Sequence, residues 1–181
     1  MIHHAAIAVK DFKKSHYFYT HVMGFRLVAG VKRQAPGGGW TKHMFYDQGD
    51  GSLLAIWDLK GIEGVLIQPQ EWRSGISTGL GLPGWVNHLA FEVPSQEEFD
   101  KRKQRWLDNG YHVSETDHAF IRSCYTYDPD HNWVEWTLKL RNLTPADLDE
   151  AEQILVDDTP STVPDYEGAF TRSTVPKKWA P

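Results

Sequence analysis

Two histidines stand in the same short phrase, one in each half of the chain, and the imidazole ring is a common metal ligand. His4 opens the run HAAIAV and His88 opens the run HLAFEV, so that a valine follows each histidine five positions later. Repetition of this kind indicates a duplicated unit, in which two equivalent histidines can face one shared site. His3 competes with His4, but neighbours on a strand point to opposite faces, and the repeat selects His4.

A carboxylate closes the second half of the repeat. The turn DGS at 50–52 and the turn DHN at 130–132 each precede a strand-like run, and aligning them at an offset of 80 places Glu135 opposite Ala55. We therefore predict His4, His88 and Glu135 as metal ligands. Two histidines and one carboxylate on one face of an octahedral ion leave room for a substrate and O₂. This suits non-haem Fe(II), and Mn(II) or Zn(II) would fit the same donors.

Each of these residues also has a plainer reading. A single histidine on a strand is more often a structural residue with a hydrogen-bonded ring than a metal ligand. Glu135 taken alone would be a solvated strand residue. The identical register of the two histidines, and the place of Glu135 in the closing strand of the repeat, favour the metal site.

Hydrophobic periodicity predicts the elements that must position these residues. Each half has the pattern of a strand, a helix and three further strands, and the second helix begins with a capping pattern at Ser95 and Glu98. The chain therefore predicts two βαβββ units. The expected strands lie at 2–9, 25–31, 40–46, 52–57, 86–93, 111–115, 120–127 and 133–138, and the expected helices at 11–23 and 95–109.

The two units define the domain organisation. We predict one domain over 1–140, composed of module one at 1–59, a linker at 60–84 and module two at 85–140. The linker is rich in Gly, Pro and Ser. It is either a rim or lid of the site or a plain surface connector.

Residues 141–181 form an extension outside the repeat. Thr144-Pro145 predicts a helix start, and a short apolar stripe follows at Leu148, Ala151, Ile154 and Leu155. We expect the extension to wrap the domain or a partner subunit, and we expect the protein to be a homo-oligomer.

Composition excludes several classes of function. The 181 residues are 40% hydrophobic and 13% aromatic, enough to bury a full core. A net charge of -5 without a basic stripe argues against nucleic-acid binding. No apolar run approaches the roughly 20 residues of a membrane span, and the first residues lack the apolar segment of a signal peptide. With Cys124 as the single cysteine, no internal disulfide can form, and we expect a cytoplasmic setting.

With these residues in view, the chain resembles the vicinal oxygen chelate superfamily, which includes glyoxalases, bleomycin resistance proteins and extradiol dioxygenases. The resemblance covers roughly residues 1–140. It implies a fold of the α+β class, with two tandem βαβββ modules whose mixed sheets form a metal-holding cup, followed here by a helical or irregular C-terminal extension.

One stretch resembles the signature of the type I extradiol dioxygenases. In that signature a histidine precedes a tyrosine, and an acidic-Pro turn then leads to the ligand glutamate, as His118, Tyr125, Asp128-Pro129 and Glu135 do here. The resemblance implies that Tyr125 hydrogen-bonds a catecholate oxygen and that His118 holds or delivers a proton. Three residues depart from the usual signature without removing a group that the reaction needs: Asp117, Cys124 and His131.

His43 is a further candidate acid or base. The offset of 80 pairs it with Ser123 and pairs Phe45 with Tyr125, so it should face the cup. A histidine that completes a strand network is an equally good reading. Trp57 and Trp133, on or beside the same strands, could wall an aromatic substrate.

The expected function is Fe(II)-dependent extradiol cleavage of a catecholic aromatic compound with O₂. Other metal-dependent reactions of the superfamily remain open: a glyoxalase-type isomerase, an epimerase or a thiol transferase. Glyoxalase-like members and epimerases generally add a carboxylate from module one, where Ala55 stands, and thiol transferases acting on fosfomycin typically lack the pairing of His118 with Tyr125. A protein that sequesters an aromatic ligand is the third alternative, although such members usually lack the three ligands.

Overall fold

Module one folds as a strand, a helical segment and three strands. The computed structural model describes residues 2–62, 72–164 and 167–178. Strand β1 (His4–Val9) is followed by α1 (Phe12–Tyr17), which continues as a π-helical turn, η1 (Phe18–Val22). The strands assemble in the order β1-β4-β3-β2, with β1 parallel to β4 and the other pairs antiparallel. The remaining bounds are β2 (Arg26–Gln34), β3 (Trp40–Asp47) and β4 (Leu53–Lys60).

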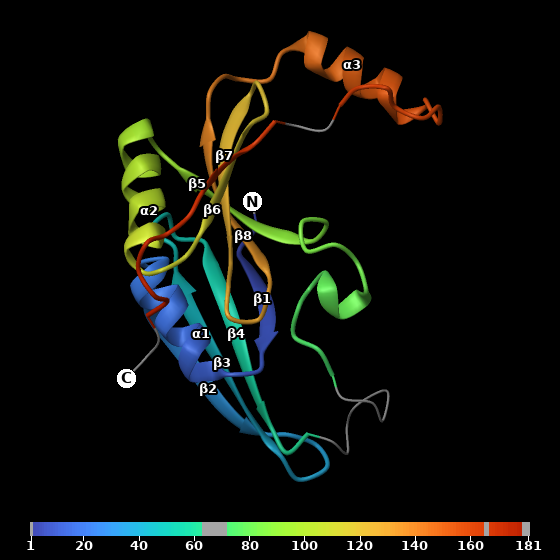
Figure 1. Ribbon diagram of the computed structural model, residues 1–181. Helices are drawn as coiled ribbons and strands as arrows, with labels where there is room; N and C mark the ends of the chain where they lie inside the picture. The colour runs from blue at the N-terminus through green and yellow to red at the C-terminus, as the bar shows by residue number, and fades with distance from the viewer. Residues whose placement is uncertain (1, 63–71, 165–166, 179–181) are drawn as a thin grey trace.

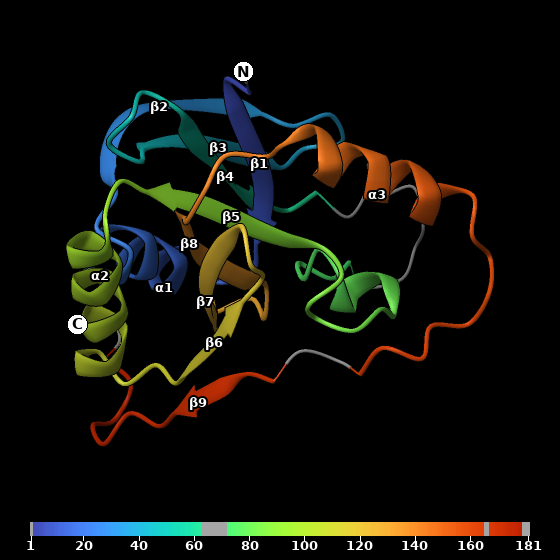
Figure 2. The same ribbon diagram turned by 90° about the horizontal axis from the view of Figure 1, so that it is seen from above.

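Module two repeats this arrangement. Its strands take the order β5-β8-β7-β6-β9, in which β5 is parallel to β8 and β9, from the extension, pairs with β6 (Figure 2). A short 3-10 turn, η3 (Thr78–Leu80), precedes the module, and α3 (Pro145–Leu155) follows it. The other elements are β5 (His88–Val93), α2 (Gln96–Asp108), β6 (Val113–Asp117), β7 (Ile121–Tyr127), β8 (Trp133–Lys139) and β9 (Ala169–Thr171).

The predicted α+β fold with two βαβββ modules is confirmed, and so is the equivalence of the two halves. His4 pairs with Leu53, and His88 pairs with Trp133. Two positions further along the same strands, Ala6 lies opposite Ala55 and Ala90 lies opposite Glu135. The offset of 80 between the closing strands therefore holds residue by residue.

Several predicted boundaries were wrong. The first strand begins at His4 rather than residue 2, and β2 runs on to Gln34 because antiparallel pairing with β3 continues to the pair Gln34–Trp40. The predicted helix at 11–23 divides into α1 and the π-helical turn. The predicted start of α3 at Thr144-Pro145 is confirmed by a capping box between Thr144 and Asp147. Part of the predicted linker, 63–71, lies outside the described residues.

The hydrophobic core lies between the helices and the inner faces of both sheets. Phe25 contacts the rings of Phe91 and Trp136 at 5.1 and 5.9 Å, and Phe18 contacts Tyr111 at 5.1 Å. Figure 1 shows α1 below α2 on the same flank of the molecule. Because strand side chains alternate, the residues opposite the core, including His4 and His88, face outward.

Two buried aspartates join the modules. Asp130 accepts hydrogen bonds from the Lys10 backbone amide at 2.7 Å and the Ser15 hydroxyl at 2.9 Å. Asp128 accepts the Tyr19 hydroxyl at 2.8 Å and two backbone amides of its own turn. The turn that leads to Glu135 is thereby fixed to the first helical segment of module one.

Within the described part of the chain, no helix combines the length and apolar character needed to cross a membrane.

Burial of Asp128 gives the stability of the fold a dependence on pH. Burial raises the pKa of this carboxyl from 3.8 to about 6, against the lowering effect of its hydrogen bonds. The folded protein therefore binds this proton more tightly than the unfolded chain does. The contribution of Asp128 to the free energy of unfolding is complete below pH 4, and it falls by about 3 kcal/mol as pH rises through 6. We expect Asp128→Asn to remove this slope from urea unfolding measured at pH 4 to 7. The exposed Asp149→Asn is the control and should keep the wild-type slope; an equal slope in Asp128→Asn would contradict the assignment.

Candidate metal and substrate site

The outer face of module two brings two predicted ligands together. The Nε2 atom of His88 lies 3.1 Å from Oε2 of Glu135, and Glu135 is almost fully buried whereas His88 is partly exposed. The other ring nitrogen of His88, Nδ1, lies 3.0 Å from the carbonyl oxygen of Trp85. That acceptor selects the tautomer protonated at Nδ1 and directs the Nε2 lone pair towards Glu135. A nitrogen and an oxygen so placed can share a proton or a metal ion.

Ser123 completes this arrangement, and the sequence reasoning gave it no role. Its hydroxyl donates a short hydrogen bond to Oε1 of Glu135 and lies 3.2 Å from the hydroxyl of Thr137. The carboxylate is therefore held by Ser123 on one oxygen and faces His88 with the other. Strand alternation was the available signal, because Ser123 and Tyr125 lie two positions apart and share a face.

His118 and Tyr125 form the predicted pair beside these ligands. Nε2 of His118 lies 3.0 Å from the Tyr125 hydroxyl, and the Tyr125 ring stacks on Trp133 at 4.7 Å. The ring of Tyr125 also lies 6.4 Å from that of His88. Because the Tyr125 ring is packed and buried, its hydroxyl has a fixed position at the edge of the His88–Glu135 pair.

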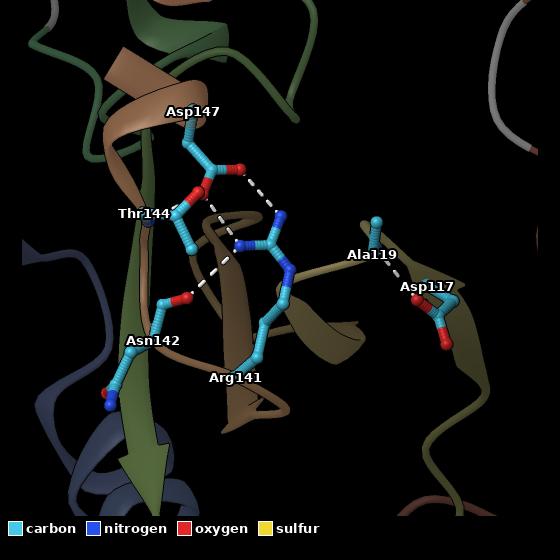
Figure 3. A network of polar contacts seen from close by, with 6 residues as sticks. All are labelled: Asp117, Ala119, Arg141, Asn142, Thr144 and Asp147. Atoms are coloured by element: carbon cyan, nitrogen blue, oxygen red, sulfur yellow. Dashed lines mark hydrogen bonds and ion pairs between the residues drawn. The ribbon is translucent and has the colours of Figure 1, made fainter.

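A tight turn sets the position of His118. The same turn explains why Asp117, which departs from the usual signature, precedes this histidine. Ala119 adopts a left-handed backbone conformation, with φ of 68°. The Asp117 carboxylate accepts the Ala119 backbone amide at 2.9 Å (Figure 3) and pairs with Arg122 at 3.2 Å. Asp117 therefore stabilises a conformation that costs free energy in a residue other than glycine. His131, which also departs from the usual signature, lies in a turn as well and has a positive φ of 61°.

Module one holds a separate group of rings. His43 stacks on Trp57 with ring centres 3.8 Å apart, and it lies against Phe45 at 4.3 Å. His4 lies 5.8 Å from Phe45 and 6.4 Å from His43. Burial, with a smaller effect of His4, lowers the pKa of His43, which favours the neutral ring. Its buried Nε2 has no hydrogen-bond partner among the described residues.

The structure brings together two of the three predicted ligands within one chain. His88 and Glu135 meet, but His4 lies with His3 and the module-one rings, where the Nδ1 atoms of the two histidines are 2.9 Å apart. Over the described ranges, no set of three or more His, Cys, Asp or Glu side chains is placed to hold one ion. A single chain in this arrangement therefore fits two donors of the expected set and not all three.

Comparison with known proteins identifies the family. Residues 1–136 match the model of the Glyoxalase/Bleomycin resistance protein/Dioxygenase superfamily, and the chain belongs to this superfamily. The catechol-2,3-dioxygenase of Bacillus subtilis (strain 168) is 23% identical over 134 residues, which are 74% of this chain and 40% of that protein. The chain therefore spans well under half of that relative.

Solved structures share the fold. A glyoxalase/bleomycin resistance protein/dioxygenase from Nocardioides has a TM-score of 0.53 at 23% identity, over 80% of this chain and 87% of its own. TnmS3, an antibiotic binding protein from Streptomyces sp. CB03234, has a TM-score of 0.51 at 17% identity, over 77% of this chain and 95% of its own. At these identities the likeness concerns the fold alone.

The contact between Ser123 and Glu135 predicts an effect on metal affinity. Ser123→Ala removes the hydrogen bond that orients the carboxylate, and loss of such a supporting contact typically weakens metal binding by about 10- to 100-fold. Titration with Co(II) would measure this change. Cys124→Ala, on the same strand but the opposite face, is the matched control. Equal affinities of the two variants would show that Ser123 does not orient a ligand.

Proposed function

We propose that the protein is an Fe(II)-dependent extradiol dioxygenase that opens a catecholic aromatic ring with O₂. The observation that carries this proposal is the contact of His118 with Tyr125, 3.0 Å long, on the sheet face where His88 meets Glu135. A proton-carrying pair beside two metal donors suits a reaction in which a phenolic substrate loses and regains protons. The similarity to a protein named catechol-2,3-dioxygenase supports the same reaction class.

Tyr125 and His118 have separate tasks in this proposal. The Tyr125 hydroxyl, fixed by the stacking of its ring on Trp133, hydrogen-bonds an oxygen of the substrate. His118 exchanges a proton with that hydroxyl through Nε2, so that charge on the substrate oxygen is balanced. Trp133, whose ring stacks on that of Tyr125, offers an aromatic surface beside the pair, and this favours a flat ring.

We propose His88, Glu135 and His4 as the metal ligands. His88 and Glu135 are already in contact. His4 stands on the outward face of the other sheet, so its participation requires that the two outward faces approach each other, within one chain or between two copies. The donor set of two nitrogens and one carboxylate suits Fe(II), and it would also accept Mn(II) or Zn(II).

A second candidate function is the binding of an aromatic ligand without turnover. The separation of His4 from the other two donors favours it, as does the stacked group of His43, Phe45 and Trp57 on module one. In this case the protein would bind an aromatic compound without a bound metal.

Metal content of purified variants separates the two functions and tests each ligand. We expect the wild-type protein to retain about one Fe(II) or Co(II) per chain after dialysis, and His88→Ala, Glu135→Ala and His4→Ala to lose it because each removes one donor. His21→Ala, an exposed histidine on the helical segment η1, is the control and should retain the ion. Retention by His4→Ala would remove His4 from the ligand set, and a wild-type protein that binds no metal would favour the binding function.

Oxygen uptake tests the reaction itself. With Fe(II)-loaded protein and a panel of catechols, we expect O₂ consumption together with a yellow ring-opened product. Tyr125→Phe and His118→Phe should lower turnover by about 100-fold or more while leaving the metal bound, because they remove proton handling and not a ligand. Tyr127→Phe, on the same strand, is the control.

Two other outcomes would contradict this proposal. Metal bound without oxygen uptake would redirect the search to thiol-transfer, isomerase and epimerase substrates. Loss of metal from Tyr125→Phe or His118→Phe would assign that residue to metal binding instead.

A further inference from the structure

Helix α3 extends away from the domain with its apolar side uncovered. None of its residues is buried, and Figure 1 shows it projecting beyond the sheet of module two. The apolar side chains are among the most exposed in the described chain: Leu148 is 60% exposed, Ile154 65%, Leu155 81% and the adjoining Val156 80%. Large apolar side chains gathered on one exposed helix indicate a contact surface.

The start of α3 is stabilised by contacts with the residues that follow β8. Thr144 and Asp147 form a reciprocal capping box, and Arg141 binds both oxygens of Asp147 at 2.6 and 2.7 Å (Figure 3). An isolated helix of about this length is marginally stable in water, and packing of one face normally supplies the rest of its stability. We therefore expect a partner surface for α3.

The free edge of module one offers such a surface. Strand β2 is the last strand of its sheet, and all nine of its residues are exposed. Beside it lies a hollow of about 500 Å³, lined by residues 27–32 with Lys42 and Met44. Gly30 leaves the Met44 thioether uncovered there, since a Cβ atom at Gly30 would lie only 2.7 Å from the sulfur. An open apolar strand edge is a site that proteins normally cover.

The two surfaces are complementary in charge. The α3 segment carries acidic residues and no basic ones: Asp147, Asp149, Glu150 and Glu152, followed by Asp157 and Asp158. The edge around the hollow carries basic residues: Arg26, Lys32, Arg33 and Lys42. Arg26 and Lys42 also pair with Asp47 and Asp58 of their own chain. Apolar residues flanked by opposite charges favour one docking orientation.

These two surfaces cannot meet within one chain as it is folded. Figure 1 places α3 at one end of the molecule and β2 at the other. Since both surfaces occur on every copy, two chains related by a twofold axis can satisfy both at once.

We propose that α3 of one copy docks on the β2 hollow of a second copy, and that the exchange is reciprocal. The apolar stripe of α3 covers the exposed apolar residues of β2, and the acidic side of the helix faces Lys32 and Arg33 of the partner copy. This assembly is independent of the proposed catalytic function, because none of the residues that form it is a proposed ligand or a proton carrier.

The test is the mass of the full-length protein in solution, measured by light scattering over a range of concentrations. We expect a dimer for the wild-type chain. Leu155→Asp on α3 and Val28→Asp on β2 should each raise the dissociation constant by at least about 30-fold, as expected for a central contact of an interface. Lys32→Glu, an exposed substitution with no effect on the core, is a second β2 variant in case Val28→Asp is misfolded. Val163→Asp, exposed but outside both surfaces, should remain dimeric.

Mixing the variants tests the reciprocal arrangement. A chain with Leu155→Asp keeps an intact β2, and a chain with Lys32→Glu keeps an intact α3. A mixed dimer of the two therefore retains one unaltered contact between α3 and β2. It should associate more tightly than a dimer of either variant alone. A wild-type monomer at all concentrations would overturn the proposal. Pairing of α3 with α3 would also overturn it, and would appear as loss of the dimer in Leu155→Asp with no effect of Lys32→Glu.

Discussion

The packing of residues 15–25 of module one against module two is the contact on which the rest of the structure depends. It buries Phe18 and Phe25 of module one among the aromatic residues of module two, and the two aspartates of the 128–132 turn lock it in place. Because side chains alternate along a strand, this choice of inner face also determines the outer face. The histidines that open β1 and β5 are exposed for that reason. The hydrophobic core and the chemical groups thus occupy opposite sides of the same strands.

Much of this architecture could be predicted because its signals are local. Turn residues, helix caps and alternating patterns lie within a few positions of one another, and the duplication allowed each half to check the other. The register of β8 against β5 confirmed the alignment that singled out Glu135. The starts of α2 and α3 were also predictable, since Ser95 and Thr144 accept hydrogen bonds within their own first turns.

The relative placement of the two modules could not be predicted in the same way. It depends on contacts such as that between Phe25 and Trp136, which join residues far apart in the sequence and leave no periodic signal. His4 lies on the outward face of its own sheet, but the structure does not bring it to His88 and Glu135. The predicted ligand set itself stays a prediction. Ser123 was missed for a related reason, because its role appears only when β7 and β8 are placed side by side.

Because Cys124 is buried, its reactivity reports on local opening of the native protein. This single cysteine lies within the core on β7, next to residues of the candidate site, and burial raises the pKa of its thiol. A thiol-reactive dye can therefore reach it only when the sheet of module two separates from the helices. The rate of labelling would measure how often that separation occurs in the native protein, without any engineered probe.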